Sequence, residues 1–186
     1  MALHIGQPVD HSFDEPLGLL SDCHRRIEHF LTVLRTYASL PSHSLTREQK
    51  LEIQDALAYF ENAAPRHTAD EERSLFPRLR QSDHPDARKA LEVLERLERD
   101  HEIADLHHRA IDELWRRRLA LEELPPQEMQ ELRDRLGVLQ AIYREHITAE
   151  DNEVFPTAAR VLSRSELLEV GMEMAGRRRR ESDESV

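Results

Sequence analysis

Four histidines of this sequence are each followed, four positions later, by a carboxylate. The pairs are His24/Glu28, His67/Glu71, His101/Asp105 and His146/Glu150. Positions i and i+4 share one face of an α-helix and lie about 6 Å apart along its axis. A helix with this spacing can therefore offer an imidazole and a carboxylate to neighbouring metal ions.

All four histidines stand where the helical period of their segment calls for an apolar residue. The apolar periods run over Leu17–Ala38, Ile53–Leu75, Leu91–Trp115 and Leu132–Val154. Glu71 and Glu150 fall in the same periods, whereas Glu28 and Asp105 stand one step aside. A surface ion pair or a satisfied core histidine explains one such pair. Four histidines and two carboxylates on apolar faces favour a metal, because unpaired buried charge is costly.

The expected metal ligands are four histidines and two glutamates: His24, His67, Glu71, His101, His146 and Glu150. Six side chains exceed the needs of one tetrahedral zinc ion, and no thiolate is among them. They suit two iron ions of octahedral tendency, with the glutamates bridging and positions left open. Manganese and zinc use the same donor types, so the residues alone do not choose the metal.

Three further residues are candidates for the surroundings of this site. We expect Glu28 and Asp105 to orient the imidazole N–H groups of their own or adjacent helices. His108 lies in the apolar period two turns, roughly 10 Å, after His101. It is expected to be a buried histidine outside the ligands, with a ligand or channel role as the alternative.

One segment of the sequence occurs twice. Residues 67–77 (HTADEERSLFP) align with residues 146–156 (HITAEDNEVFP), so that the histidine, an acid pair, Phe and Pro hold the same offsets. The repeat indicates two similar helix hairpins that face each other and bring the four histidines to one depth.

Four helical periods with short connections predict an all-α, up-down-up-down four-helix bundle with a short C-terminal helix and a flexible tail. No strand signal competes, because aromatic content is 5% and no β-branched run alternates. The expected organisation is an N-terminal arm (1–13), the bundle (14–162), a short C-terminal helix (163–176) and a disordered charged tail (177–186).

Composition excludes several classes of protein. A chain of 186 residues suits one domain with a full core, and its single cysteine cannot form an internal disulfide. A net charge of −11 argues against nucleic acid as a partner. No run approaches ~18 apolar residues, and no secretory signal is visible at the N-terminus. We therefore expect a cytoplasmic protein without a membrane span.

The pattern resembles the hemerythrin-like, or HHE cation-binding, domain family over roughly residues 15–162. The resemblance rests on His24, on His101 and on the two motifs His67-x-x-x-Glu71 and His146-x-x-x-Glu150, each followed by a Phe-Pro step. It implies a non-haem di-iron centre inside a four-helix bundle, with bridging carboxylates and an oxo or hydroxo bridge. Members of the family carry or sense oxygen, respond to nitric oxide or peroxide, or store and donate iron.

This sequence differs from the oxygen carriers of this family at two positions, and these differences limit which functions the resemblance implies. Those carriers place a second histidine where this chain has Asp105, and an Asp five residues after the histidine that corresponds to His146. The chain is closer to four-His, two-Glu variants linked to iron handling and to oxygen or nitrosative stress. The expected function is a di-iron protein that binds, senses or reacts with O₂, NO or peroxide. The alternatives are iron storage or delivery without turnover, and a helical interaction module that uses the tail Arg177–Val186.

Overall fold

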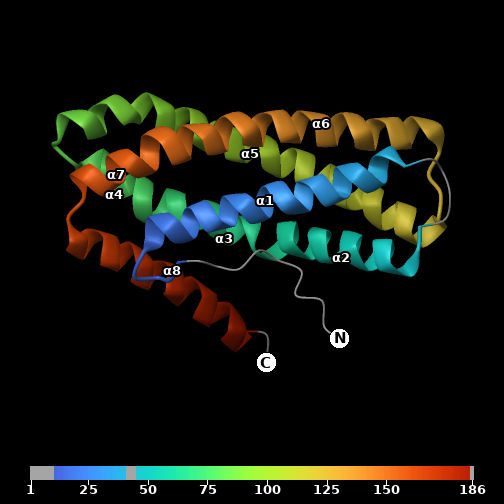
Figure 1. The fold of residues 1–186 in the computed structure, drawn as a ribbon, viewed down its shortest axis with the longest axis horizontal. Helices are drawn as coiled ribbons and strands as arrows, with labels where there is room; N and C mark the ends of the chain where they lie inside the picture. The colour runs from blue at the N-terminus through green and yellow to red at the C-terminus, as the bar shows by residue number, and fades with distance from the viewer. Residues whose placement is uncertain (1–10, 41–44, 185–186) are drawn as a thin grey trace.

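A computed structural model describes residues 11–40 and 45–184, and every regular element in these ranges is helical (Figure 1). The elements are α1 (Pro16–Ser39), α2 (Arg47–Asn62), α3 (Ala64–Asp70), η1 (Glu71–Leu75), α4 (Phe76–Gln81), α5 (Pro85–Leu121), α6 (Pro126–Ala149), η2 (Glu150–Val154), α7 (Phe155–Val161) and α8 (Arg164–Glu184). The prediction of an all-α fold is confirmed. None of the described helices combines the length and the apolar character that crossing a membrane requires.

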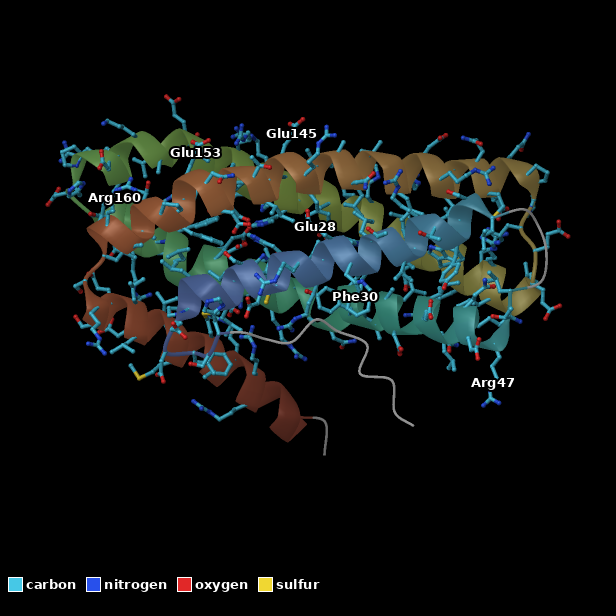
Figure 2. The ribbon with its side chains drawn as sticks, viewed as in Figure 1. Glu28, Phe30, Arg47, Glu145, Glu153 and Arg160 are labelled. Carbon is cyan, nitrogen blue, oxygen red and sulfur yellow. The ribbon has the colours of Figure 1, made fainter. Side chains whose placement is uncertain are left out.

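The long helices pack against one another in a ring. Helix α5 contacts α6, α6 contacts α1, α1 contacts α2, and α2 contacts α5. Two of these columns are interrupted: α2 continues through α3, η1 and α4, and α6 continues through η2 and α7 (Figure 1). Helix α8 runs back from one end along the outside of the molecule, where it packs on α1, α3 and η1 (Figure 1). Exposed charged side chains such as Glu145, Glu153 and Arg160 cover the outside (Figure 2).

The beginnings of the helices follow from local sequence. Helix α2 starts with a capping box, in which Thr46 Oγ1 accepts the Gln49 backbone N–H and the Gln49 side chain accepts the N–H of Thr46. Pro16, Pro85 and Pro126 each open a helix, where proline has no hydrogen bond to lose.

The two copies of the sequence repeat share an unusual backbone. In each copy the α-helix widens into a π-helical turn, at Glu71–Leu75 and at Glu150–Val154. The N–H of Phe76 bonds to the carbonyl of Glu71, five residues back, and Phe155 does the same with Glu150. A proline follows each phenylalanine, and its ring crowds the carbonyl four residues earlier. The widened turn therefore accommodates the Phe-Pro step in both copies, and turns of this kind are frequent at functional sites.

The apolar core is divided into two clusters along the length of the molecule. One contains Ile27 and Trp115, and the other contains Leu20 and Phe76. On α1, His24 lies between Leu20 of the second cluster and Ile27 of the first, and all three side chains are buried. The polar residues of the repeats thus occupy a layer with hydrocarbon on both sides.

The C-terminal segment differs from the expectation. Helix α8 continues to Glu184, so the predicted end of the helix at 176 and the predicted disorder of 177–184 are wrong. Arg177 Nε and an Arg178 amino group donate to the two carboxylate oxygens of fully buried Asp70, at 2.7 and 2.8 Å. These ion pairs hold the arginines on α3, and arginine is a good helix former. Residues 185–186 of the expected tail and residues 1–10 of the expected arm lie outside the described ranges.

Candidate metal centre

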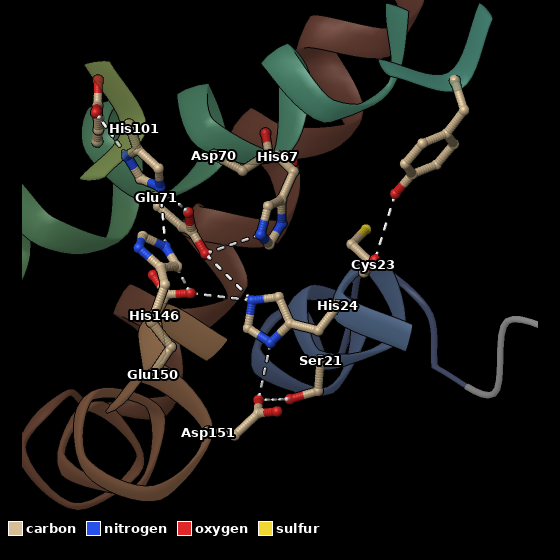
Figure 3. A network of polar contacts seen from close by, with 12 residues as sticks. Ser21, Cys23, His24, His67, Asp70, Glu71, His101, His146, Glu150 and Asp151 are labelled. Carbon is tan, nitrogen blue, oxygen red and sulfur yellow. Dashed lines mark hydrogen bonds and ion pairs between the residues drawn. The ribbon is translucent and has the colours of Figure 1, made fainter. Parts of the chain in front are cut away.

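The structure brings all six expected ligands into one buried layer, from four helical columns (Figure 3). Their donor atoms form two groups, and within each group the atoms lie within 4.8 Å of one another. The first group contains His24, His67, Glu71 and Glu150, and the second contains Glu71, His101, His146 and Glu150. The two glutamates therefore belong to both groups, whereas each histidine belongs to one.

Every histidine of the site contacts a glutamate through its Nε2 atom. The contacts are His24 to Glu150 Oε2 at 3.0 Å, His67 to Glu71 Oε1 at 3.2 Å, His101 to Glu71 Oε2 at 3.4 Å and His146 to Glu150 Oε2 at 3.1 Å. The Nε2 atoms of His101 and His146 are 3.1 Å apart. Each glutamate thus joins one histidine of its own column to one from another helix, with both carboxylates completely buried.

Three of the four imidazoles have an acid at their outer nitrogen atom, whereas Nδ1 of His67 is buried without a hydrogen bond to the described residues. These acids are not the ones expected from the sequence. Glu28 and Asp105 are exposed, and Asp105 pairs with Arg109, so the expectation that these two acids orient the imidazoles is wrong. Both face solvent because they stand one step outside the apolar period of their helices.

Three other acids occupy the outer positions instead. Asp151 Oδ1 lies 3.1 Å from Nδ1 of His24, Glu72 Oε1 lies 2.8 Å from Nδ1 of His101, and Asp100 Oδ2 lies 3.6 Å from Nδ1 of His146. Two of the three, Glu72 and Asp151, are the second acid of the pair in each repeat. The repeated pair of acids is the sequence feature that could have identified these partners. Its first acid faces the centre, and its second acid contacts a histidine on another helix.

His108 lies outside both groups of donor atoms. Its Nε2 atom is 2.8 Å from the hydroxyl of Tyr143, and its ring packs on Phe60 with 4.4 Å between the ring centroids. Burial lowers the pKa of His108 to about 4, so its imidazole is neutral at pH 7. The structure thus places His108 in the layer next to the candidate ligands, on the side of Tyr143.

Burial and the neighbouring carboxylates act in opposite directions on the histidines. Burial dominates at His67 and lowers its pKa to about 4. Burial also disfavours charge on His101, but the carboxylates of Glu71 and Glu72 outweigh it and raise its pKa to about 10. At His24, the hydrogen bond to Asp151 makes the largest contribution against burial, and the pKa lies well above its usual value.

The two glutamates stay ionised despite their burial. Burial raises the pKa of Glu71, but the imidazoles of His67, His101 and His24 more than compensate and hold it well below its usual value. The pKa of Glu150 is also lowered, although both burial and the charge of Glu71 oppose this. Two carboxylates that share one buried layer repel each other, and a cation between them removes that repulsion.

The hydrogen bonding of these atoms tests whether a cation fits. Nε2 of His24 and all four carboxylate oxygens of Glu71 and Glu150 are buried, and none has a hydrogen bond of normal geometry within the described residues. Buried polar atoms are rarely left in this state. They are nitrogen and oxygen donors that converge from different helices, which is the chemistry of iron and manganese sites. The residues therefore fit a metal cation.

Comparisons with known proteins agree with this geometry. The family model described as "Hemerythrin HHE cation binding domain" matches residues 15–158, which include all six candidate ligands. A protein of Haemophilus influenzae, described only as uncharacterized, is 30% identical over 172 residues, which cover 90% of this chain and 92% of that protein.

Proposed function

The chain belongs to the hemerythrin HHE cation-binding domain family, and from this premise we propose that it is a non-haem di-iron protein that binds, senses or reacts with O₂, NO or peroxide. In this proposal His24 and His67 would hold one ion, and His101 and His146 would hold the other. Glu71 and Glu150 would contribute to both ions as bridging ligands. The single observation that carries the proposal is that both glutamates belong to both groups of converging donor atoms.

The chain's own residues account for three requirements of such a centre. The acids Asp151 and Glu72 hold the imidazoles of His24 and His101 by their outer nitrogens, which fixes the ring orientation and makes the inner nitrogen a better donor. The apolar clusters on both sides limit the access of water to the site. Two bound iron ions would supply one-electron chemistry and an open position for a small ligand.

We also propose that the helices form an up-down-up-down bundle. The ring of contacts from α1 to α2, α5, α6 and back to α1 supports this arrangement, as do the short connections between consecutive columns. Helix α8 then packs on the outside of the bundle and holds η1, the turn that carries Glu71, through the ion pairs of Asp70 at the end of α3.

Iron storage or delivery is the second candidate function. It is favoured by one observation: the side chain of His101 is 9% exposed, whereas those of the other five proposed ligands are at most 5% exposed. An ion held by His101 is therefore the nearer of the two to solvent. The third candidate, an interaction module built on the tail, has less support, because Arg177 and Arg178 are engaged with Asp70.

Metal analysis tests the proposal. Protein produced with added iron should contain about two irons per chain and show oxo-bridge absorption under air that is lost on anaerobic reduction. His67→Ala and His146→Ala should each lower the iron content. Glu150→Gln should lower the affinity for iron. His29→Ala, a change at an exposed position on α1, is the matched control. A stable protein that takes up no metal would refute the proposal.

The rates of redox cycling and of iron release distinguish the two metal-dependent candidate functions. A reactive centre should cycle between oxidised and reduced forms when oxidant and reductant are supplied, with its iron retained. A storage or delivery protein should instead lose iron to a chelator within the same period and show no repeated turnover.

A further inference from the structure

We infer that small uncharged ligands enter the metal site between α3 and α5, and that the hydroxyl of Tyr143, positioned by His108, donates a hydrogen bond to the ligand at the inner end of this route. The inference rests on the proposed function, because it concerns the ligand of that site. It is argued from three adjoining cavities and from the contact between Tyr143 and His108, two of the side chains that line them.

The innermost cavity lies at the site itself. Its volume is about 10 Å³, on the order of one water position. The four candidate histidines line it, together with Tyr143 and four other side chains. Within this lining, Tyr143 provides a hydroxyl that is not one of the proposed ligands. A molecule held here is therefore surrounded by the four imidazoles and by Tyr143 and Thr68, the two hydroxyl-bearing side chains of the lining.

Two larger cavities connect this space with the surface. The middle one, of about 170 Å³, shares Ala64, Thr68, His101 and Tyr143 with the innermost cavity. The outer one, of about 280 Å³, shares Phe60, Pro65, Asp105 and His108 with the middle cavity. Since Asp105 and Arg109 at its rim are exposed, the outer cavity opens to solvent. Together the three spaces form one route from the surface to the metal site.

The character of the walls determines which molecules can use this route. Phe60, Ala64, Pro65 and Ala104 line its middle part with hydrocarbon. The Asp105 carboxylate and the His101 imidazole also line this part, but a charged molecule would still lose much of its hydration against the hydrocarbon walls, which is costly. The small volume of the innermost cavity excludes bulky molecules. The route therefore selects small uncharged molecules such as dioxygen, nitric oxide and hydrogen peroxide.

Tyr143 and His108 are two polar residues along this route that contact each other, and Thr68 also lines its inner and middle cavities. Tyr143 lines the inner and middle cavities, His108 lines the middle and outer ones, and the two side chains are in contact at 2.8 Å. A neutral imidazole has one N–H, and when this is on Nε2 it donates to the phenol oxygen. The phenol proton is then available to the ligand. In this arrangement Tyr143 contacts the ligand and His108 is a positioning residue.

Nitric oxide binding to the reduced, iron-loaded full-length protein tests the inference. Tyr143→Phe removes one oxygen and keeps the ring, so it should leave the iron content unchanged and shift the N–O stretching frequency of bound nitric oxide. The parent protein should also show a small shift of this frequency in D₂O, which Tyr143→Phe abolishes. His108→Leu should give a weaker change of the same sign. A purely structural role of Tyr143 would leave the frequency unaltered.

Ala104→Leu tests the route. The larger side chain should fill part of the middle cavity and slow nitric oxide association about tenfold or more, at the iron content of the parent. Ala120→Leu, an exposed change on the same helix beside a separate groove, is the matched control and should not alter the rate. If Ala104→Leu does not fold, the smaller change Ala104→Val tests the route in the same way, and Tyr143→Phe separately tests the hydrogen bond to the ligand.

The outcomes separate the inference from the proposed function. A parent protein that holds iron but never binds nitric oxide, O₂ or peroxide would refute the ligand-binding function itself. A parent that binds nitric oxide, with the frequency unchanged in Tyr143→Phe or the rate unchanged in Ala104→Leu, would overturn the inference and leave the function standing.

Discussion

The carboxylate of Asp151 lies 3.1 Å from Nδ1 of His24, although 127 positions separate the two residues in the sequence. Ser21 donates to the same carboxylate oxygen at 2.8 Å. The counterpart of this contact joins Glu72 to His101 in the opposite direction between the two helix hairpins. Each hairpin therefore supplies the acid that orients a histidine of the other, and the two copies of the repeat tie the halves of the molecule together.

Removing this acid should weaken metal binding without removing a proposed ligand. Asp151→Ala should lower the affinity for iron about 10- to 100-fold, because outer partners of this kind fix ring orientation and donor strength. Competition with a coloured chelator measures the change. Glu28→Ala is the control, since Glu28 follows His24 by one turn but is exposed. Equal affinities in the two variants would mean that the contact of Asp151 with His24 does not support the metal.

Metal removal should lower the thermal stability of the protein. Glu71 and Glu150 lie in one buried layer and repel each other when no cation stands between them. A ligand at a hundred times its Kd stabilises the folded state by about 2.7 kcal/mol. For a chain of this size that corresponds to a rise in Tm of roughly 5–11 °C. Calorimetry with and without a chelator checks this, and identical Tm values at saturating metal would contradict it.

Replacement of Gly171 by alanine should disrupt the contact between α8 and the backbone of Phe13. A Cβ atom built there would lie 1.8 Å from the backbone oxygen of Phe13. A backbone atom cannot move away by a change of side-chain rotamer. We expect Gly171→Ala to reduce the free energy of unfolding by about 1–3 kcal/mol, as overpacked sites do. Gly176 on the same helix has nothing within 4 Å of the added atom. Gly176→Ala should therefore stabilise the protein by about 0.5–1 kcal/mol, through helix propensity alone. Denaturation by urea compares the two variants.

The docking of α8 should weaken in acid. Hydrogen bonds from Arg78 lower the pKa of the Glu173 carboxyl below its usual value, against the effect of burial. A group whose pKa is lower in the folded state contributes stability above its unfolded-state pKa, and this contribution is lost as the pH falls through the folded-state pKa. Hydrogen exchange of the α8 amides should therefore accelerate below about pH 4, relative to the other helices. The variant Glu173→Gln should lose this part of the pH dependence. An unchanged pH profile of α8 hydrogen exchange would contradict a role of the Arg78–Glu173 pair.

Much of the candidate site was predictable because its residues obey a local rule. His67 and Glu71 share a helix face by their spacing alone, as do His146 and Glu150, and the helical period placed them on the apolar side. The family resemblance drawn from these motifs is confirmed by the match over residues 15–158. Whether the six residues bind iron stays a prediction.

The outer partners of the imidazoles were not predictable by the same rule. In sequence, an exposed acid four residues after a histidine, such as Glu28 or Asp105, cannot be distinguished from an acid that contacts an imidazole of the site. Asp151 lies on η2, which continues α6, and it reaches His24 because α6 and α1 pack side by side. The contact of Tyr143 with His108 likewise depends on the packing of α6 on α5.

By itself, the sequence determined the helices, the buried placement of four histidines and two glutamates, and the duplication of the motif, because helical periodicity and i, i+4 spacing act within one segment. The tertiary structure decided which acids orient the histidines, that Arg177 and Arg178 close on Asp70 and extend α8, and that cavities reach the site beside Tyr143. These features join side chains from different helices, and the distances between helices depend on how their surfaces pack rather than on the order of residues within any one of them.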